Sequence, residues 1–219
     1  MTKLLPLLLI ASATLAQPAT YKGREIAETM SYHGAPWLIR ESREQEEHPK
    51  KLLQALSLKP GQTVADIGCG NGFYTLQMAE IVGPAGRALA VDIQPEMLEL
   101  LVERARGAEI SNVEPILGAP GEPKLPESAV DLILLVDVYH EFSFPERMLQ
   151  AMRAALKPGG RVAIAEYRME DTDVPIKLLH KMTKKQVVRE FNANGFKLAE
   201  SYDELPWQHL LFFEKSDQR

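Results

Sequence analysis

The chain has 219 residues, of which 45% are hydrophobic, and it carries a net charge of -5 at pH 7. This length suits one α/β domain with an extension and disfavours two full domains. The negative charge disfavours a nucleic-acid-binding surface, which is usually basic. The only cysteine, Cys69, has no partner for an internal disulfide. We therefore expect a single domain that does not bind nucleic acid.

The first sixteen residues have the pattern of a secretory signal peptide. Lys3 is followed by an apolar run from Leu4 to Ala16 that ends in small residues. These thirteen residues are fewer than the roughly 20 that a membrane-spanning helix needs. We predict a signal peptide over residues 1–16, which exports the protein to the periplasm or the extracellular space without stable membrane insertion. An uncleaved membrane anchor, or a misassigned start codon and a cytoplasmic protein, are the alternatives.

From residue 63 onward, predicted strands alternate with predicted helices. Short apolar runs bounded by Gly and Pro indicate buried strands, and longer segments that begin at Pro or end at Gly indicate helices. Such alternation is typical of a doubly wound α/β fold with a parallel sheet. The predicted strands are 63–68, 88–92, 113–117, 131–138 and 161–167, and the predicted helices are 73–82, 95–105, 145–156 and 184–194.

The chain ends in two further predicted strands, 196–202 and 208–215. Only the segment DELPW joins them, which is too short for a parallel crossover, so the two strands must pair antiparallel. Before the sheet, residues 17–58 form an extension with leucines at helical spacing near its end. We therefore divide the chain into a leader, this extension and a domain over residues 59–219.

The segment VADIGCGNG joins the first predicted strand to a helix through a glycine-rich turn. Such a turn leaves unpaired N–H groups and a surface free of side chains, which suits a nucleotide-like ligand. The pattern is D-x-G-x-G-x-G, with Asp66 two residues before Gly68. A carboxylate there would repel a pyrophosphate and would suit a cationic ligand.

The second predicted strand ends at Asp92, twenty residues after Gly72. A carboxylate at this position typically accepts hydrogen bonds from ribose hydroxyls. A ligand with a ribose and a positive charge points to S-adenosylmethionine. A nicotinamide-dependent oxidoreductase would also need Asp92, but it would normally carry G-x-G-x-x-G and no terminal hairpin.

Taken together, these motifs resemble class I S-adenosylmethionine-dependent methyltransferases. VADIGCGNG is similar to that family's glycine loop, AVDIQPEML to its ribose-binding acid, and LKPGGRVAIAEY to its turn and fifth strand. The resemblance extends over residues 60–215. It implies a seven-stranded sheet with an antiparallel last strand, S-adenosylmethionine as cofactor, S-adenosylhomocysteine as product, and a catalytic domain over residues 59–219.

The resemblance also implies which residues surround the cofactor. Many members of the family place an acid after the third strand to hold adenine, but here the stretch is Gly118-Ala119-Pro120. The contact with adenine is therefore either missing or made by a backbone group or by Glu122. N-terminal extensions in the family often form a lid, as residues 31–37 would do here unless Trp37 only fastens the extension to the sheet. The implied cofactor-binding residues are Asp66, Gly68, Gly70, Gly72, Asp92 and Ile93, with Asp137 as a further candidate.

A polar cluster follows the fourth predicted strand in the segment VDVYHEF. Methyl transfer needs a base only if the acceptor must lose a proton. His140 titrates near neutral pH and is the candidate general base, with Glu141 or Asp137 to orient it. The segment is similar to the one that supplies the base in small-molecule O-methyltransferases, although His140 and Glu141 would also serve to anchor the loop. The candidate catalytic residues are His140, Glu141 and Tyr139.

The predicted function is methylation of a small-molecule acceptor, with oxygen as the preferred atom because of His140. The alternatives are the oxidoreductase and a non-catalytic S-adenosylmethionine-binding module. No HExxH or paired CxxC motif and no acid triad with metal-ligand spacing occurs, so no metal is predicted. His180, near a predicted helix start, is expected either to face the pocket or, as is more usual for such a histidine, to lie at the surface.

Overall fold

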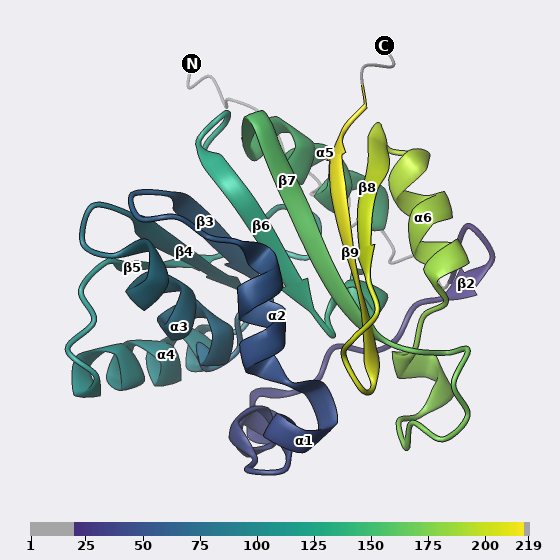
Figure 1. Ribbon diagram of the computed structural model, residues 1–219, viewed down its shortest axis with the longest axis horizontal. Coiled ribbons are helices and arrows are strands. Elements are labelled where there is room, and N and C mark those ends of the chain that lie inside the picture. The colour runs from purple at the N-terminus through teal and green to yellow at the C-terminus, as the bar shows by residue number, and fades with distance from the viewer. Residues whose placement is uncertain (1–19, 217–219) are drawn as a thin grey trace, which may run out of the picture.

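The computed structural model describes residues 20–216, and the predicted leader lies outside them. Its centre is a seven-stranded sheet with the order β5-β4-β3-β6-β7-β9-β8 (Figure 1). Only β9 runs against its neighbours, β7 and β8. The predicted doubly wound, mostly parallel sheet with an antiparallel last strand is therefore confirmed. The strands are β3 Thr63–Ile67, β4 Arg87–Asp92, β5 Val113–Leu117, β6 Val130–Val136, β7 Leu156–Tyr167, β8 Phe196–Tyr202 and β9 Gln208–Lys215.

Helices cover both faces of the sheet because successive residues of each buried strand point to opposite sides. In β3, Val64 packs into the hydrophobic core under α2 and α3, whereas Ala65 packs into the core under α5 and α6. The helix α4 contacts the first of these faces through Leu98 and Leu101. The helices are α2 Pro49–Leu56, α3 Phe73–Val82, α4 Pro95–Gly107, α5 Pro145–Ala155 and α6 Lys184–Asn192.

Two local details differ from the sequence-based expectation. The strand β7 begins at Leu156, before the predicted PGG turn, and its pairing with β6 shifts register between Val130 and Leu132. The spacing of Thr183 and Gln186 predicts a capping box, in which each side chain bonds to the backbone amide of the other residue. At the start of α6, Thr183 does cap the Gln186 amide, with an Oγ1 to N distance of 3.1 Å. The Gln186 side chain does not complete the reciprocal bond, because it donates to Glu190.

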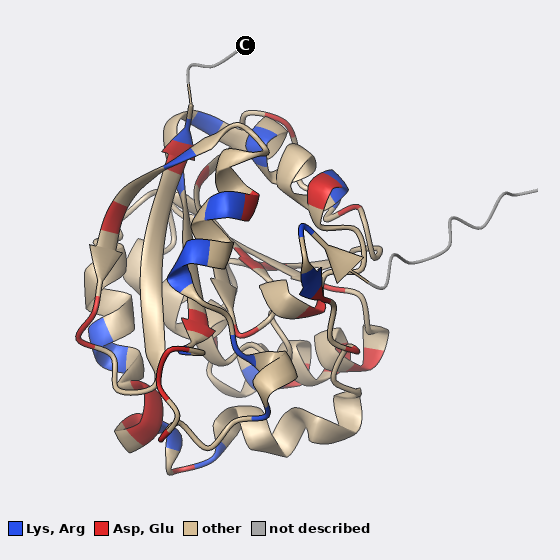
Figure 2. Cartoon of the chain, turned by 90° about the vertical axis from the view of Figure 1, so that its right-hand side faces the viewer, with Lys and Arg blue, Asp and Glu red and all other residues tan. Residues whose placement is uncertain are grey.

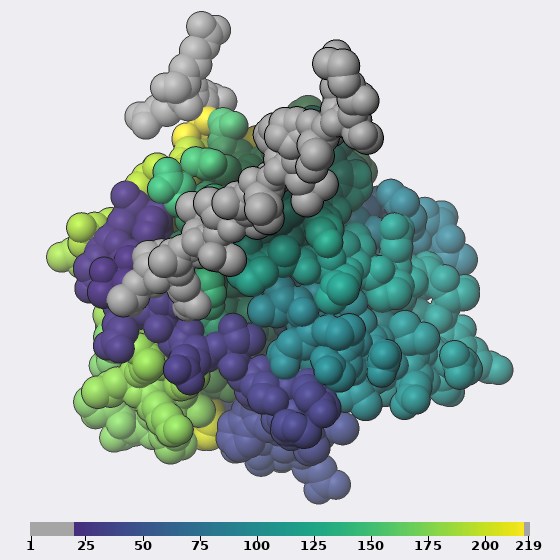
Figure 3. All heavy atoms as spheres, turned by 180° about the vertical axis from the view of Figure 1, so that it is seen from behind, coloured from purple at the N-terminus to yellow at the C-terminus, as the bar shows by residue number. Residues whose placement is uncertain are grey.

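The N-terminal extension runs across the ends of the sheet strands and joins elements that are far apart in sequence. Arg24 donates to Glu190 of α6 at 3.0 Å, and the Tyr32 amide donates to the side chain of Gln94, just before α4, at 2.8 Å. Figure 3 shows this segment in purple against the green C-terminal part and the teal central part. Its elements are β1 Thr20–Tyr21, β2 Arg24–Glu25, the 3-10 helix η1 Tyr32–Ile39 and α1 Arg43–Glu47.

Acidic and basic residues, coloured along the ribbon in Figure 2, alternate over the elements on this side of the molecule. Opposite charges also pair across neighbouring strands, as Lys197 of β8 and Glu214 of β9 do at 3.8 Å. A nucleic-acid-binding face normally concentrates basic residues, and this side does not. Within residues 20–216, no helix combines the length and the apolar character needed to span a membrane.

Candidate active site

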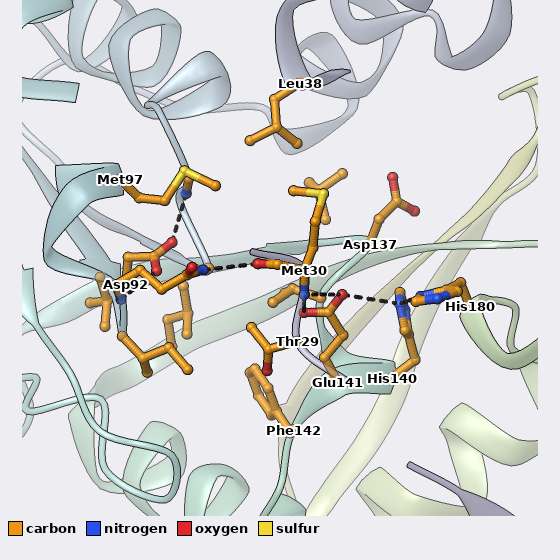
Figure 4. A pocket seen from close by; sticks show the side chains of 18 of the residues that line it. Thr29, Met30, Leu38, Asp92, Met97, Asp137, His140, Glu141, Phe142 and His180 are labelled. Atoms are coloured by element: carbon orange, nitrogen blue, oxygen red, sulfur yellow. Dashed lines mark hydrogen bonds and ion pairs between the residues drawn. The ribbon is translucent and has the colours of Figure 1, made fainter. Parts of the chain in front are cut away.

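A cavity of about 590 Å³ lies at the carboxyl ends of the parallel strands. Ligands of open α/β sheets bind at this end, where the loops that follow the strands meet. Here the loops after β3, β4 and β6 contribute to the wall, and the N-terminal extension adds side chains from the other side (Figure 4). The residues on which the site depends include Leu38, Gly68, Asp92, Asp137, His140 and His180.

The turn after β3 presents bare backbone to the cavity. Gly68 and Gly70 have φ angles of +73° and +52°, in the left-handed region that favours glycine. A Cβ atom on Gly68 would collide with the side chain of Val138, and one on Gly70 would lie 2.5 Å from Cδ1 of Leu38. Both residues line the cavity, so a ligand can approach the backbone closely at this turn.

Asp92 and Ile93 also line the cavity, directly after β4. The Asp92 carboxylate accepts hydrogen bonds from the backbone amides of Gly70 and Gln94, each at 2.9 Å. Burial raises the pKa of Asp92, while these amide bonds act in the opposite direction. The carboxylate is therefore held between the glycine turn and the start of α4, with Ile93 39% exposed beside it.

Asp66 and Gly72 do not line the cavity, contrary to the positions that the resemblance implies. The Asp66 carboxylate lies behind the turn and accepts a 2.6 Å hydrogen bond from the Thr75 hydroxyl. Burial raises the pKa of Asp66 to about 6. Gly72 is the N-cap of α3, and a Cβ there would lie 2.9 Å from Leu101 of α4. Asp66 therefore supports the turn, and Gly72 lets two helices pack.

Asp137 follows β6 and faces the cavity with an unusual backbone conformation, at φ +50°. Its Oδ2 atom accepts a hydrogen bond from Gln208 at 2.7 Å, whereas Oδ1 is buried and has no hydrogen-bond partner among residues 20–216. Burial, followed by the negative charges of Glu47 and Glu166, raises the pKa of Asp137 well above its ordinary value. An unpaired buried acceptor is costly, so a bound cationic or hydrogen-bond-donating group would be stabilised at this position.

The stretch after β5 forms an apolar part of the wall through Gly118, Ala119 and Pro120. The Ala119 amide is already bonded to the carbonyl of Glu122, at 2.8 Å. A backbone group and the Glu122 side chain were the two candidates for the contact with adenine. The Glu122 side chain does not line the cavity, so only the backbone is placed for that contact.

His140 lies in the short 3-10 helix η2 (Tyr139–Glu141) and is 2% exposed. Its Nδ1 atom is 2.7 Å from Oε2 of Glu166, near the end of β7, and its Nε2 atom is 3.0 Å from Nδ1 of His180. Burial alone would lower the pKa of His140, but the charge and hydrogen bond of Glu166 outweigh it and raise the pKa.

Glu141 also lines the cavity and lies beside the His140 ring (Figure 4). Its Oε1 atom is 3.8 Å from His140 Nε2, and its two oxygens accept from the Met30 amide at 3.3 Å. Burial raises the pKa of Glu141 to about 7, although the neighbouring His140 acts in the opposite direction. This carboxylate is therefore easily protonated unless a positive charge lies near it.

Tyr139 does not belong to the catalytic group that the sequence suggests. It is fully buried outside the cavity wall, and its hydroxyl donates to Glu190 of α6 at 2.7 Å. The turn of η2 sends Tyr139 into the core and His140 toward the cavity. Glu166 was not among the predicted site residues, although a carboxylate near the end of an otherwise apolar strand is a signal for one. His180, for which a surface position was the more usual expectation, lies at the cavity wall.

Three comparisons with known proteins agree with this architecture. A family profile described as "Methyltransferase domain" matches residues 58–209. The chain belongs to this methyltransferase family. A solved structure of an S-adenosylmethionine-dependent methyltransferase from Aquifex aeolicus superposes with a TM-score of 0.79 and 25% identity, over 84% of this chain and 98% of that one. The expected family, fold and cofactor, S-adenosylmethionine, are thereby confirmed.

Curated relatives in the family are similar over part of their length. An arsenite methyltransferase from Halobacterium salinarum is 34% identical over 110 residues, which is 50% of this chain and 28% of that protein. A demethylmenaquinone methyltransferase from Listeria welshimeri is 29% identical over 114 residues, 52% of this chain and 48% of that protein. The chain thus spans less than half the length of these relatives.

The residues of the cavity fit this family's cofactor. The turn at Gly68 and Gly70 offers backbone that no side chain covers, and Asp92 stands after the strand next to it. The unpartnered Oδ1 of Asp137 is suited to a cationic group such as the amino group or sulfonium of the cofactor. No part of this fit requires Asp66 or Gly72 to touch the ligand.

Proposed function

We propose that the protein transfers a methyl group from S-adenosylmethionine to an oxygen atom of a small, largely apolar acceptor, with His140 as the general base. The observation that carries this proposal is the pairing of His140 with Glu166 in the same cavity as Asp92 and Asp137. Deprotonation and methyl transfer require a base and a cofactor site in the same cavity.

When bound, the cofactor supplies an electrophilic methyl group on a positively charged sulfur. Asp92 would accept from the ribose hydroxyls, because each of its oxygens keeps a second lone pair beyond the amide bonds it already accepts. Asp137 would pair with a cationic group of the methionine moiety through Oδ1. Gly70 lets the backbone of the turn approach the ligand.

His140 is suited to take a proton at Nε2. With Nδ1–H donating to the Glu166 carboxylate, the tautomer assigned from this network makes Nε2 the accepting atom. In the structure this atom contacts His180 Nδ1, which a hydroxyl of the methyl acceptor would have to replace. A hydroxyl that loses its proton to Nε2 becomes a stronger nucleophile, and the imidazolium that forms is stabilised by Glu166. His180, 3.0 Å away, provides a route for the proton toward solvent.

We also propose that the extension over residues 17–58 closes the cavity as a lid. Met30, Leu38 and Arg43 of this segment all line the cavity, which supports exclusion of water from it. Shortening the extension should lower the affinity for the cofactor, while the sheet domain still folds. Unchanged affinity would contradict the lid.

Export by residues 1–16 is a further proposal, supported by the apolar run after Lys3. Fractionation of cells that express the full chain tests it. We expect a mature protein that begins near Gln17 in the exported fraction. Uncleaved protein in the cytosol would contradict export, and uncleaved protein in the membrane fraction would favour an anchor instead.

An acceptor screen with matched histidine variants tests the proposed reaction. Chelator-treated protein is incubated with S-adenosylmethionine and acceptors that carry an acidic hydroxyl, together with demethylmenaquinone and arsenite, the substrates in the relatives' names. Formation of S-adenosylhomocysteine and the mass and connectivity of the product identify the methylated atom. Turnover of none, with cofactor binding intact, would favour the non-catalytic module, and a methyl group on another atom would contradict O-methylation.

For an accepted substrate, His140→Ala should lower kcat by about 10²-fold or more with little change in cofactor affinity. His33→Ala is the control, because His33 is exposed and lies outside the cavity wall. Activity of His140→Ala within a few-fold of the wild type would remove His140 as the base.

A further inference from the structure

Three groups that commonly bind metals converge on one wall of the cavity. His140 Nε2 lies 3.0 Å from His180 Nδ1 and 3.8 Å from Glu141 Oε1, and the three donor atoms all lie within 4.8 Å of one another. In Figure 4 the three side chains point toward one another. Ligands at about 2.0–2.2 Å from a tetrahedral metal lie roughly 3.3 Å apart. Small side-chain rotations would therefore close these groups around an ion.

His140 is held in the orientation of a metal ligand. Histidines that bind metals usually donate their other ring N–H to a carboxylate or carbonyl, which fixes the ring and its tautomer. Glu166 does this at 2.7 Å, and the backbone amide of Tyr139 holds Glu166 in turn, at 2.9 Å. A general base would also need a carboxylate such as Glu166 at Nδ1. It would not need a second imidazole and a second carboxylate, those of His180 and Glu141, near Nε2.

The charge around the cluster favours a dication. Glu141 and Glu166 place two carboxylates beside the two rings, and within residues 20–216 the hydrogen bonds to the Glu141 oxygens come from the Met30 amide alone. Of the nearby cations, Arg24 is already paired with Glu190, at 3.0 Å, whereas Lys177 also lines the cavity and its charge acts on His180. A divalent ion would balance both carboxylates and would keep Glu141 ionised in a buried position.

We propose that His140, His180 and Glu141 form a binding site for a divalent cation of the zinc class. Two imidazole nitrogens and one carboxylate are a ligand set that Zn²⁺ takes in proteins when a fourth position stays open, and here that position faces the cavity. This site departs from the sequence-based expectation of no metal, because that expectation considered only ligands at short, regular spacing, whereas His140 and His180 stand forty residues apart.

Metal binding is a property beyond the proposed function. A bound ion would prevent His140 from acting as the general base. The lone pair on His140 Nε2 binds either a proton or a cation, so His140 acts as the base in the cation-free protein. For this reason the binding test below uses no acceptor, and the acceptor screen above uses chelator-treated protein.

Titration of chelator-treated protein with Co²⁺ tests the site directly, because Co²⁺ takes zinc sites and absorbs visible light according to its coordination. We expect saturation at one equivalent, with displacement by Zn²⁺ measured in a parallel calorimetric titration. Glu141→Gln and His180→Ala should each weaken binding by at least about tenfold, since even supporting residues change affinity by about 10–100-fold. His33→Ala should bind as the wild type does.

Absence of saturable Co²⁺ binding, or equal affinity in the wild type and both ligand variants, would overturn the metal site. Thermal unfolding of each variant excludes misfolding as the cause, and His180 and Glu141 are suited to this because neither is fully buried. Failure of this titration leaves the cofactor and base tests unaffected, and failure of the acceptor screen leaves the metal site unaffected.

Discussion

Replacement of Glu166 by Gln separates the charge of this residue from its structural role. The glutamine has nearly the same shape, and its Oε1 atom can still accept from the Tyr139 amide, as Glu166 does at 2.9 Å. The change removes the negative charge 2.7 Å from His140 Nδ1. Burial lowers the pKa of His140, and the charge and hydrogen bond of Glu166 raise it, so the substitution should lower this pKa.

The expected kinetic result follows from the protonation state of the base. His140 must be neutral to accept a proton, so activity rises as pH increases through its pKa and stays constant above it. In Glu166→Gln this rise should move to lower pH. Above the rise, kcat should fall by about 10²-fold, or about 2.7 kcal/mol, because the imidazolium loses its partner and a weaker base accepts the proton.

The assay is kcat against pH for chelator-treated protein, followed by formation of S-adenosylhomocysteine. Cofactor affinity should change little, because Glu166 does not line the cavity. Glu214→Gln is the control, because Glu214 is an exposed carboxylate of β9 that does not line the cavity. If the activity of Glu166→Gln increased over the same pH range as that of the wild type, and its kcat stayed within a few-fold of the wild-type value, the base assignment would be refuted.

The other predictions concern cofactor binding and stability. Asp92→Ala should lower affinity for S-adenosylhomocysteine by about tenfold or more in calorimetry, since a charge-assisted hydrogen bond contributes about 1.5–3 kcal/mol, while unfolding stays cooperative; unchanged affinity would contradict the ribose assignment. Gly70→Ala should lower the free energy of unfolding by about 1–2 kcal/mol because of its left-handed φ and the contact with Leu38. A stability equal to wild type would show that the turn relaxes freely. Glu190→Gln should cost about 3–5 kcal/mol in denaturant unfolding, because it leaves the Arg24 guanidinium, 8% exposed, without its carboxylate; a loss below about 1 kcal/mol would contradict this.

The fold could be predicted because its signals are local. Apolar runs such as Val130–Val136 and the short link before Gln208–Lys215 follow from the pattern along the chain. Asp92 could be found for the same reason, since its place at a strand end brings it to the site. The direction of a side chain within a turn depends on packing with distant segments. For this reason the sequence could not separate the neighbours Tyr139 and His140, which face the core and the cavity respectively.

Contacts between distant segments account for the rest of the site. Glu166 and His180 meet His140 across 26 and 40 residues of sequence. A strand order that brings β6 beside β7 places Glu166 there, but only packing of the loop after β7 brings His180 close. Asp66 matched the family pattern, yet its carboxylate accepts from Thr75 and it does not line the cavity.

Parallel calorimetric and thermal-shift titrations with S-adenosylhomocysteine, S-adenosylmethionine and NAD identify which cofactor this cavity binds. A ligand that binds only the folded protein stabilises it, by about 2.7 kcal/mol at a concentration one hundred times its Kd. We predict saturable binding and stabilisation by the two adenosyl-sulfur ligands and neither with NAD. Stabilisation by NAD alone, or by none of the three, would contradict the assignment of this cavity to methyl transfer.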